Sequence, residues 1–405
     1  MTGPLADITI LDFTHMVCGP YATKLLADFG ANVIKVESIG GEPGRWLVPF
    51  QGDSPDPERS GSFAYLNTNK RSITIDLKHP SAASVVERLC ARADVVVESF
   101  SPGTLDRLGI GWEFIHRARP SAPLISISNF GATGPYRDYQ GTELTLFGFG
   151  GEMYTMGIAG REPVKMYGTA ALVQSGAAAA TAIMAAGMVG IGQGIGQHVD
   201  FSIVDSHLLG NDRRHATAIA HEFSGKKSFR SGGTGIAAAE GTYPCADGWV
   251  EFTAASQRLD RLADMLGNPE WFQGPHWKAP GALLSPDLVE EFNGHFYGWL
   301  AERTKREVWA EARRAKVLCG PLMTVEDLCT DEHFVPRGFL QQVDHPRMGQ
   351  FTMPGRPFSM PASPWELRLP APLIGEHTES VLADCGYSAD EIGRLDTDGV
   401  VGVRR

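Results

Sequence analysis

The sequence has few cysteines for its length and no C-x-x-C pair. Six cysteines are scattered through 405 residues, which argues against a disulfide framework or a zinc site and predicts reduced thiols. Basic residues are also scarce: 36 Lys and Arg stand against 47 Asp and Glu, for a formal net charge of -11. A chain of this charge lacks the basic surface that nonspecific nucleic-acid binding requires. Nucleic acid is therefore not an expected partner, although a local basic pocket remains open.

The sequence also predicts neither a secretory signal peptide nor a membrane-spanning helix. The chain does not open with a basic start and an apolar run, so we expect no signal peptide. Its most apolar stretch, MYGTAALVQSGAAAATAIMAAGMVG (166–190), contains no acidic or basic side chain and predicts a long helix of small residues. Ala and Gly are too frequent there for a typical membrane span. The composition favours a cytoplasmic protein without a membrane partner.

Strand and helix patterns alternate along the first third of the chain. Helical spacing at 19–30 and 81–93 separates β-branched runs at 8–13, 32–38, 72–77, 94–100 and 124–130. This alternation predicts βαβ units and the α/β class, with a parallel sheet in a Rossmann-like winding. Ligands of such sheets bind beyond the carboxyl ends of the strands. The segments that follow predicted strands, HMVCGP, ESFSPG and SNFGATGP, are therefore candidate pocket loops.

Composition divides the chain into four segments. Residues 1–222 predict the N-terminal part of a large domain, and the glycine-rich, basic residues 223–242 predict a linker. Residues 243–325 mix strand-like and helical patterns and predict a small domain. Residues 326–405 begin rich in proline and end in two helical patterns, so they form a separate C-terminal segment.

Three local motifs have both a structural and a functional interpretation. GIGQGIGQ (190–197) looks like a dinucleotide-binding loop, but it follows a helix and precedes a strand, which favours a tight helix-to-strand turn. His377 precedes a predicted helix, where capping and packing are at least as good an explanation as catalysis. A basic cluster favours surface charge or a subunit contact over metal binding; it comprises His207, Arg213, Arg214, His215 and His221.

Basic residues gather around one predicted strand. NTNKRSITIDLKHP carries Lys70, Arg71 and Lys78, and Arg107 follows the next strand. Each one alone is typical of a solvated surface, but together they would supply cations to a phosphate-bearing ligand. The residues by themselves thus predict an α/β protein with a pocket for an anionic ligand.

Longer motifs resemble the family III CoA-transferases, the group of formyl-CoA transferase, carnitine CoA-transferase and α-methylacyl-CoA racemase. The resemblance rests on LDFTHMVCGPYATKLLADFGANVIKVES, DVVVESFSPGTLDRLGIGWEFI, GIGQHVDFSIVDS and PLIGEHTESVLADCGYSADEI, in that order, and spans nearly the whole chain. It implies a large Rossmann-like domain formed by the N-terminal half and the returning C-terminal segment. It also implies a smaller α+β domain between them and two subunits interlocked like linked rings.

The resemblance implies CoA as a substrate, with no bound cofactor and no metal. Carried over by position, the CoA-contacting set is Val17, Ile75, Lys78, Ser99, Phe100, Thr104 and Arg107. In this set Phe100 and Ile75 would flank the adenine ring, while Lys78 and Arg107 would meet phosphates.

The chain departs from the family pattern at the reacting position. Transferase members have an aspartate just before the small-residue helix, and its carboxylate attacks the acyl-CoA thioester. The spacing of formyl-CoA transferase puts Leu172 at this position, and the racemase spacing puts Ala171 there. Neither side chain is a nucleophile or a base, which leaves Glu143 as a weak candidate at a position where the family has an acid. Ser38 and Ser99 replace residues that are often Arg and Asn in the family, so each removes a polar contact.

The missing aspartate leaves three hypotheses. In the first, this chain is the non-catalytic subunit of a heteromeric enzyme that moves CoA from a donor such as succinyl-CoA to a carboxylic acid. Its partner would be a homologous subunit that carries the aspartate, as in benzylsuccinate CoA-transferase. In the second, the chain is a stand-alone acyl-CoA-binding protein, or a divergent lyase or isomerase that uses Glu143. In the third, a homodimer transfers CoA directly, without a covalent intermediate.

Overall fold

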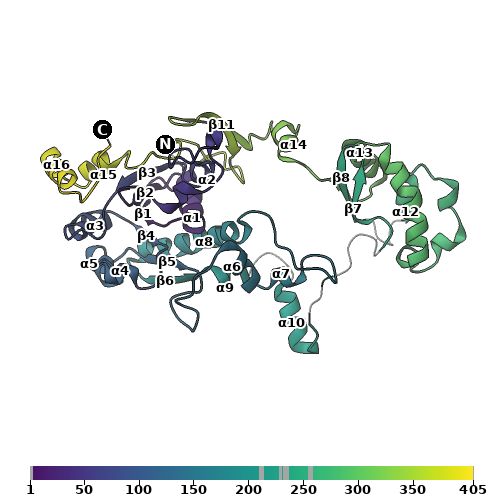
Figure 1. Cartoon of the computed structure of the whole chain (residues 1–405), viewed down its shortest axis with the longest axis horizontal. Helices are drawn as coiled ribbons and strands as arrows, with labels where there is room; N and C mark the ends of the chain where they lie inside the picture. The colour runs from purple at the N-terminus through teal and green to yellow at the C-terminus, as the bar shows by residue number, and fades with distance from the viewer. Residues whose placement is uncertain (1–2, 209–213, 228–229, 231–236, 254–258, 405) are drawn as a thin grey trace. The chain divides into compact units, whose positions relative to one another are not determined.

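The computed structural model describes residues 3–208, 214–227, 230, 237–253 and 259–404 (Figure 1). Its contacts divide the chain into two compact units. The first, which we call the sheet unit, comprises Met1–Met153, Lys165–Lys226 and Val335–Arg405. The second, the small unit, comprises Tyr154–Val164 and Lys227–Phe334. The C-terminal segment therefore packs with the N-terminal half of the chain.

Six parallel strands form the centre of the sheet unit. They lie in the order β3-β2-β1-β4-β5-β6, with bounds β1 (Thr9–Phe13), β2 (Asn32–Glu37), β3 (Lys70–Thr74), β4 (Val95–Glu98), β5 (Leu124–Ser128) and β6 (His198–Ser202). The order reverses between β1 and β4, which are hydrogen-bonded neighbours. In a doubly wound sheet this reversal opens a crevice at the carboxyl ends of the strands. The predicted α/β class is confirmed.

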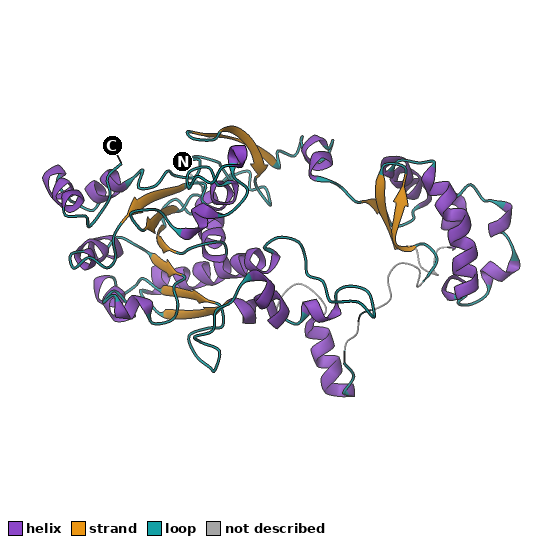
Figure 2. Ribbon diagram, viewed as in Figure 1, coloured by secondary structure: helices purple, strands orange, loops and turns teal. Residues whose placement is uncertain are grey.

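Helices cover both faces of the sheet (Figure 2). Because successive strand side chains point to opposite faces, β1 sends Leu11 into one core and Ile10 into the other. The first core holds α3 (Ala82–Cys90), α5 (Trp112–Ala118), α15 (Thr378–Asp384) and α16 (Ala389–Thr397). The second holds α1 (Cys18–Asp28) and α8 (Ala170–Gln193). The sheet is thus buried on both sides, as parallel sheets are.

Close packing explains the small residues of α8. A Cβ added at Gly176 would lie 2.7 Å from the Cys18 carbonyl oxygen, and one at Gly190 would lie 2.3 Å from the Ser121 carbonyl oxygen. Glycine at these two positions lets the helix approach neighbouring backbone directly. By length and composition alone α8 is long and apolar enough to cross a membrane, a test that the core helices of soluble proteins also pass. In this fold one of its faces is buried in the sheet unit.

The structure confirms some of the predictions for the three local motifs and contradicts others. GIGQGIGQ forms the predicted helix-to-strand turn, because α8 ends at Gln193, Gly194 takes a left-handed conformation and β6 follows. His377 occupies the N-cap position of α15 without a side-chain cap bond; its Nδ1 instead accepts the Ser72 N–H at 3.3 Å, which ties α15 to β3. His207 is buried in α9 (Ile203–Leu208), so the predicted surface position is wrong for this residue. Arg213 and the side chains of Arg214 and His215 lie outside the described residues.

The small unit has its own core. Its antiparallel sheet consists of β7 (Glu240–Cys245), β8 (Gly248–Thr253) and β9 (Cys319–Pro321). Helices α11 (Leu259–Met265), α12 (Pro286–Ala301) and α13 (Lys305–Ala315) contribute to a core with many aromatic side chains. The remaining strands, β10 (Leu340–His345) and β11 (Gly349–Pro354), form an antiparallel hairpin in the sheet unit.

Candidate active site at the carboxyl edge of the sheet

A cavity of about 610 Å³ lies at the carboxyl ends of the central strands. Residues 15–19 line it after β1, residues 99–102 after β4, and residues 127–129 at the end of β5. Residues 137–143, the first turn of α8, Leu47, Arg107, Leu146 and Ile203 complete the lining. The three loops that follow predicted strands therefore meet at one cavity, at the reversal of strand order.

Most of the predicted site residues lie together there. The lining includes Val17, Ser99, Phe100, Arg107, Glu143 and Leu172. Thr104 lies beside the cavity in α4 (Thr104–Arg107), and its hydroxyl accepts a hydrogen bond from Arg107 Nη2 at 2.7 Å. Ile75 and Lys78 are not part of the lining: Ile75 is 1% exposed in the core, and Lys78 is on the surface. Ala171 is fully buried at the start of α8.

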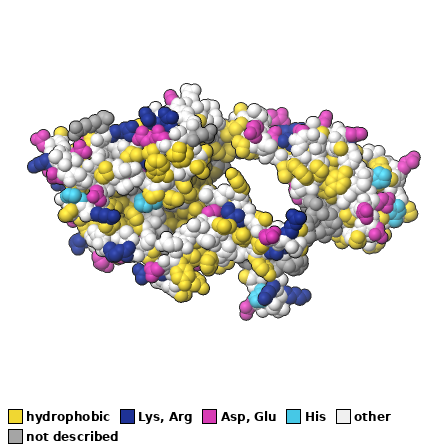
Figure 3. Space-filling view, viewed as in Figure 1, with side chains coloured by type: hydrophobic (Ala, Val, Ile, Leu, Met, Phe, Trp, Pro, Cys, Tyr) yellow, Lys and Arg dark blue, Asp and Glu magenta, His cyan; other side chains and the backbone are white. Residues whose placement is uncertain are grey.

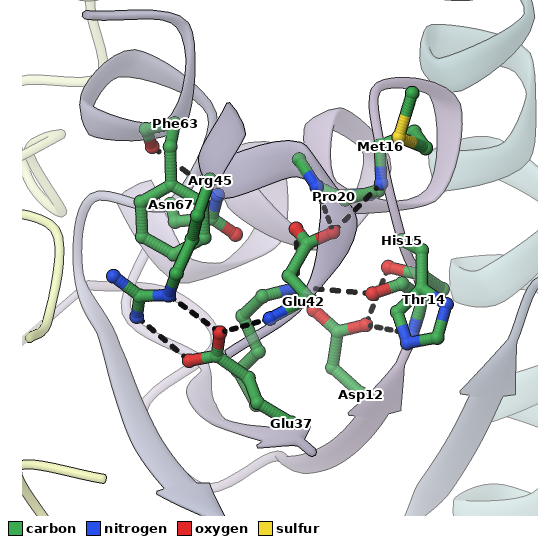
Figure 4. Close-up of polar contacts among 12 residues, drawn as sticks. Asp12, Thr14, His15, Met16, Pro20, Glu37, Glu42, Arg45, Phe63 and Asn67 are labelled. Carbon is green, nitrogen blue, oxygen red and sulfur yellow. Dashed lines mark hydrogen bonds and ion pairs between the residues drawn. The ribbon is translucent and has the colours of Figure 1, made fainter. Parts of the chain in front are cut away.

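A buried ionic network holds the first pocket loop from below (Figure 4). Asp12, at the end of β1, accepts the Thr14 N–H at 2.9 Å and forms an ion pair with Lys70 at 3.1 Å. Burial alone would raise the pKa of Asp12, but the charges of Lys70 and Lys35 and two threonine hydroxyls outweigh it and lower the pKa to about 2. Lys70 Nζ also donates to the Pro20 carbonyl oxygen at 2.9 Å. Both ends of the loop are thus fixed to buried charges.

Glu42 and Lys35 hold the middle of the same loop. Glu42 accepts the Met16 N–H at 3.1 Å and pairs with Lys35 at 3.3 Å, and Lys35 donates to the Thr14 carbonyl oxygen at 2.9 Å. Met16 has a φ of 67°, a left-handed conformation that is unfavourable for a residue with a long side chain. The bond from its amide to a buried carboxylate compensates for this conformation.

Arg45 completes the network on the far side of Glu42. Its guanidinium makes two hydrogen bonds to Glu37, at 2.6 and 2.7 Å, and stacks over the Phe63 ring at 3.8 Å. Glu37 also accepts the Glu42 N–H at 3.0 Å. The charges of three buried acids and three buried bases in this network therefore neutralise one another; they are Asp12, Glu37, Glu42, Lys35, Arg45 and Lys70. This network could not be predicted from the sequence, because a charge run around β3 is typical of a solvated surface.

The second pocket loop is tied to the first by Ser99. Its hydroxyl oxygen accepts the His15 N–H at 2.8 Å, and the His15 ring packs edge-on against Phe100 with 4.9 Å between centroids. Burial lowers the pKa of His15, with a smaller effect from the charge of Lys35, so the imidazole is neutral near pH 7. Ser99 thus holds the two pocket loops together through this hydrogen bond. His15 was missed by the sequence reasoning, although it lies in a predicted pocket loop.

Glu98 supports the same loop from within the sheet. Its carboxylate accepts the Phe100 N–H at 2.6 Å. Burial raises the pKa of Glu98 to about 7, against the opposing effect of hydrogen bonds from Ser126 and from the Phe100 amide. This acid therefore changes charge near neutral pH directly behind a pocket wall.

Two arginines meet at the rim of the cavity. Arg107 and Arg137 both line it, and a Cβ added at Gly103 would lie 3.4 Å from Arg107 Nη1 and 3.4 Å from Arg137 Nη2. Two guanidinium groups so close together form a suitable site for a doubly charged anion such as a phosphate. The sequence reasoning missed Arg137, whose only signal was its place in the GPYRDY loop after a strand.

Glu143 and the first turn of α8 form the part of the cavity where the sequence predicted the reacting position. Glu143 is the first residue of α6 (Glu143–Phe149), and its carboxylate accepts the Ala171 and Leu172 N–H groups, both at 3.2 Å. Lys165 forms an ion pair with the same carboxylate at 3.4 Å. Glu143 thereby caps a helix whose own N-cap residue, Thr169, makes no side-chain cap bond. Leu172 presents an isobutyl group to the cavity from this turn.

The described residues do not contain a cluster suited to a metal ion. No group of three or more His, Cys, Asp or Glu side chains within them is arranged to hold one. The cavity instead offers cations at the rim and a capped carboxylate with hydrocarbon walls at the other end. This arrangement suits an anionic organic ligand.

A Rossmann-like sheet with a cationic pocket at its strand-order reversal defines an α/β protein for a phosphate-bearing organic ligand. Comparison with known families identifies the chain more narrowly: it belongs to CoA-transferase family III, whose model matches residues 5–378. It is 32% identical to the formyl-CoA:oxalate CoA-transferase of Afipia carboxidovorans, over 99% of this chain and 98% of that protein. It is also 32% identical to the BbsE subunit of succinyl-CoA:(R)-benzylsuccinate CoA-transferase from Thauera aromatica, over 97% of each.

The fold is similar to a solved member of the same group. A crystal structure of a CAIB/BAIF family protein from Brucella suis matches 95% of this chain and 100% of its own, with a TM-score of 0.81 and 28% identity. The match extends through the sheet unit and the small unit alike. This protein therefore belongs to the class of CoA-transferases.

Proposed function

We propose that this chain is the non-catalytic subunit of a heteromeric family III CoA-transferase. The enzyme would move CoA from an acyl-CoA donor to a carboxylic acid, with the nucleophilic aspartate on a homologous partner subunit. In that subunit a carboxylate oxygen attacks the thioester carbonyl carbon, the C–S bond breaks, and CoA leaves as a thiolate. This chain would contribute a CoA-binding fold and half of an interlocked assembly.

The observation that carries the proposal is the chemistry of the α8 first turn. Leu172 lines the cavity at the position that the family spacing assigns to the aspartate. Glu143 is nearby, but its oxygens accept two backbone N–H groups and pair with Lys165. A carboxylate whose lone pairs are engaged in this way is a poor nucleophile, and moving it would uncap the helix. Glu143 therefore supports the site structurally.

The rim of the cavity supports CoA as the ligand. Arg107 and Arg137 would meet phosphate oxygens, and Phe100, held by Glu98, would face the adenine ring. Lys78 lies on the surface outside the lining, where it would reach only an extended part of CoA. Ile75 would contribute backbone at most, because its side chain is buried.

The exposed apolar surface supports a partner chain. Helix α10 (Arg214–Ser224) has no buried residue among 216–224, and Ile219 and Phe223 are 56% and 87% exposed. Hydrophobic side chains also spread over a face of the sheet unit (Figure 3). An amphipathic helix without a packed face is stabilised by covering that face. The BbsE relative is itself named as a subunit, which fits a partner of the same fold.

The test is purification of the untagged protein from its native host, followed by mass identification of the proteins that copurify. We expect a homologous chain with an aspartate at the position equivalent to Leu172, and transferase activity only in the complex. Turnover by a pure homodimer, or a trapped acyl adduct on Glu143, would overturn the proposal. The second result would place the nucleophile of the transferase reaction on this chain.

A further inference from the structure

The wall of the cavity beside α8 is made of hydrocarbon. Ile127, Leu146 and Ile203 are 1%, 1% and 6% exposed, and all three line the cavity. They belong to the core between the sheet and α8, and Leu172 packs against this same core. At the position of the family nucleophile, the wall therefore continues as an apolar surface.

Charges are distributed unequally along the same cavity. The cationic side chains in its lining are Arg107 and Arg137, both exposed at the rim, and Asp138 also lines the cavity there, 3.9 Å from Arg137. Near Leu172 the nearest charge is the Glu143 carboxylate. Lys165 is occupied there, since it pairs with Glu143 and donates to the carbonyl oxygens of Met166 and Gly168. A ligand carboxylate beside Leu172 would meet a like charge and no free lysine or arginine of the lining.

We infer that this chain's cavity selects CoA thioesters with a hydrocarbon acyl group over those whose acyl group ends in a carboxylate. The inference rests on the proposed function, because it assumes that the CoA phosphates occupy the arginine rim. The acyl group then reaches the wall of Ile127, Leu146, Leu172 and Ile203. Burial of each methylene against such a wall is favourable, whereas a carboxylate would lose water without gaining a partner. A dicarboxylic donor would accordingly be bound and activated by the partner subunit.

Calorimetry with a series of ligands tests this selectivity. CoA, butyryl-CoA, hexanoyl-CoA, octanoyl-CoA and succinyl-CoA are titrated into the full-length protein in the assembly in which it is isolated. Affinity should increase about two- to fourfold per methylene from butyryl to hexanoyl, since a fully buried methylene gives about fourfold. At the site of this chain, which the Leu172 variants below identify, succinyl-CoA should bind at least about tenfold more weakly than hexanoyl-CoA.

Two variants of Leu172 locate the effect in this chain. Leu172→Asn replaces the isobutyl group with a polar amide, and it should abolish the dependence on chain length while leaving free CoA affinity within about twofold. Leu172→Met keeps an apolar side chain of similar volume and should retain the dependence. Because only this chain is altered, a difference between the two variants does not come from a site on the partner.

The outcomes separate the inference from the proposed function. If CoA itself does not bind, both the proposed CoA site and the inference fail. If CoA binds but the affinities are flat across the series, or the site that responds to the Leu172 variants binds succinyl-CoA as tightly as hexanoyl-CoA, the inference alone fails. Equal chain-length dependence in Leu172→Asn and the wild type would also overturn it.

Discussion

The two walls of the cavity differ in how their buried charges are used. Under the loop that follows β1, the carboxylates of Asp12, Glu37 and Glu42 are each matched by a base and by backbone amides. At the first turn of α8, Leu172 presents an isobutyl group to the cavity, and the nearby acid, Glu143, caps a helix. One wall is therefore supported by a buried ionic network, whereas the other presents a hydrocarbon side chain to the cavity.

This difference separates ligand binding from catalysis. A buried ionic network is expensive to form, because each charge loses its hydration and requires a well-placed partner. Here the network fixes backbone that faces the cavity, including the left-handed Met16. The molecule therefore keeps a shaped pocket, which under the proposed function binds CoA while the partner subunit supplies the nucleophile. Each prediction below alters one wall and leaves the other intact.

The largest difference in activity, between this chain and the complex, is expected to remain when a carboxylate is placed at position 172. Leu172→Asp should not confer transferase activity on this chain, and turnover should stay at least about a thousandfold below that of the complex. The introduced carboxylate would lie beside Glu143, which already holds the Ala171 and Leu172 amides, so like-charge repulsion would favour its protonated form. Initial rates with succinyl-CoA and a panel of acids measure this. A variant that turns over alone would show that the apolar side chain is the sole defect.

The complementary test changes the nucleophilic aspartate of the proposed partner subunit. Replacing its aspartate with alanine should abolish activity in the complex without dissociating it, as measured by rates and by size-exclusion chromatography. Activity that survives this change would place the chemistry on the present chain.

On the polar wall, Glu42→Gln should reduce the free energy of unfolding by about 3–5 kcal/mol, since it leaves Lys35 buried without its counter-charge. Urea denaturation measures the change. Glu311→Gln is the control, because its pair with Arg314 is solvent-exposed and should contribute about 0–1 kcal/mol. The double variant Lys35→Met, Glu42→Gln should recover part of the loss. If Glu42→Gln costs no more than Glu311→Gln, the network does not hold the loop in the way proposed.

These two walls also show what the sequence could and could not predict. The alternation of β-branched runs and helices predicted the parallel sheet, and the loops after the strands predicted where the cavity lies. The roles of Lys70 and Arg45 could not be predicted, because only the fold brings Asp12 and Glu37 to them across the sheet. Arg137 was missed for the same reason: its proximity to Arg107 depends on how the loop folds back. Local spacing identifies elements and their ends, whereas long-range pairing of charges depends on the packed structure.

Glu98 gives a pH-dependent test of the wall behind Phe100. Its pKa is raised from 4.5 to about 7 in the folded protein, so between these values the folded state holds a proton that the unfolded state has released. The contribution of Glu98 to stability is therefore present below about pH 4.5 and is lost as pH rises to about 7. Glu98→Gln removes this titration and can still accept the Phe100 N–H. At pH 8 the variant should be more stable than the wild type by up to about 3 kcal/mol, with little difference at pH 5. Parallel curves for the two proteins across this range would contradict the raised pKa.

The smallest effects are expected at the arginine rim. Arg107→Ala and Arg137→Ala should each weaken CoA binding about tenfold, because each removes a charge-assisted hydrogen bond worth about 1.5 kcal/mol to a phosphate. Both losses should shrink at 0.5 M salt, since exposed charges are screened.

Arg117→Ala is the matched control, because Arg117 is an exposed arginine of α5 that does not line the cavity. Calorimetric titration with CoA measures all three variants and the double variant. If the arginines share one phosphate, the double variant should lose less than the sum of the two single losses. Wild-type affinity in both single variants would show that CoA does not use this rim.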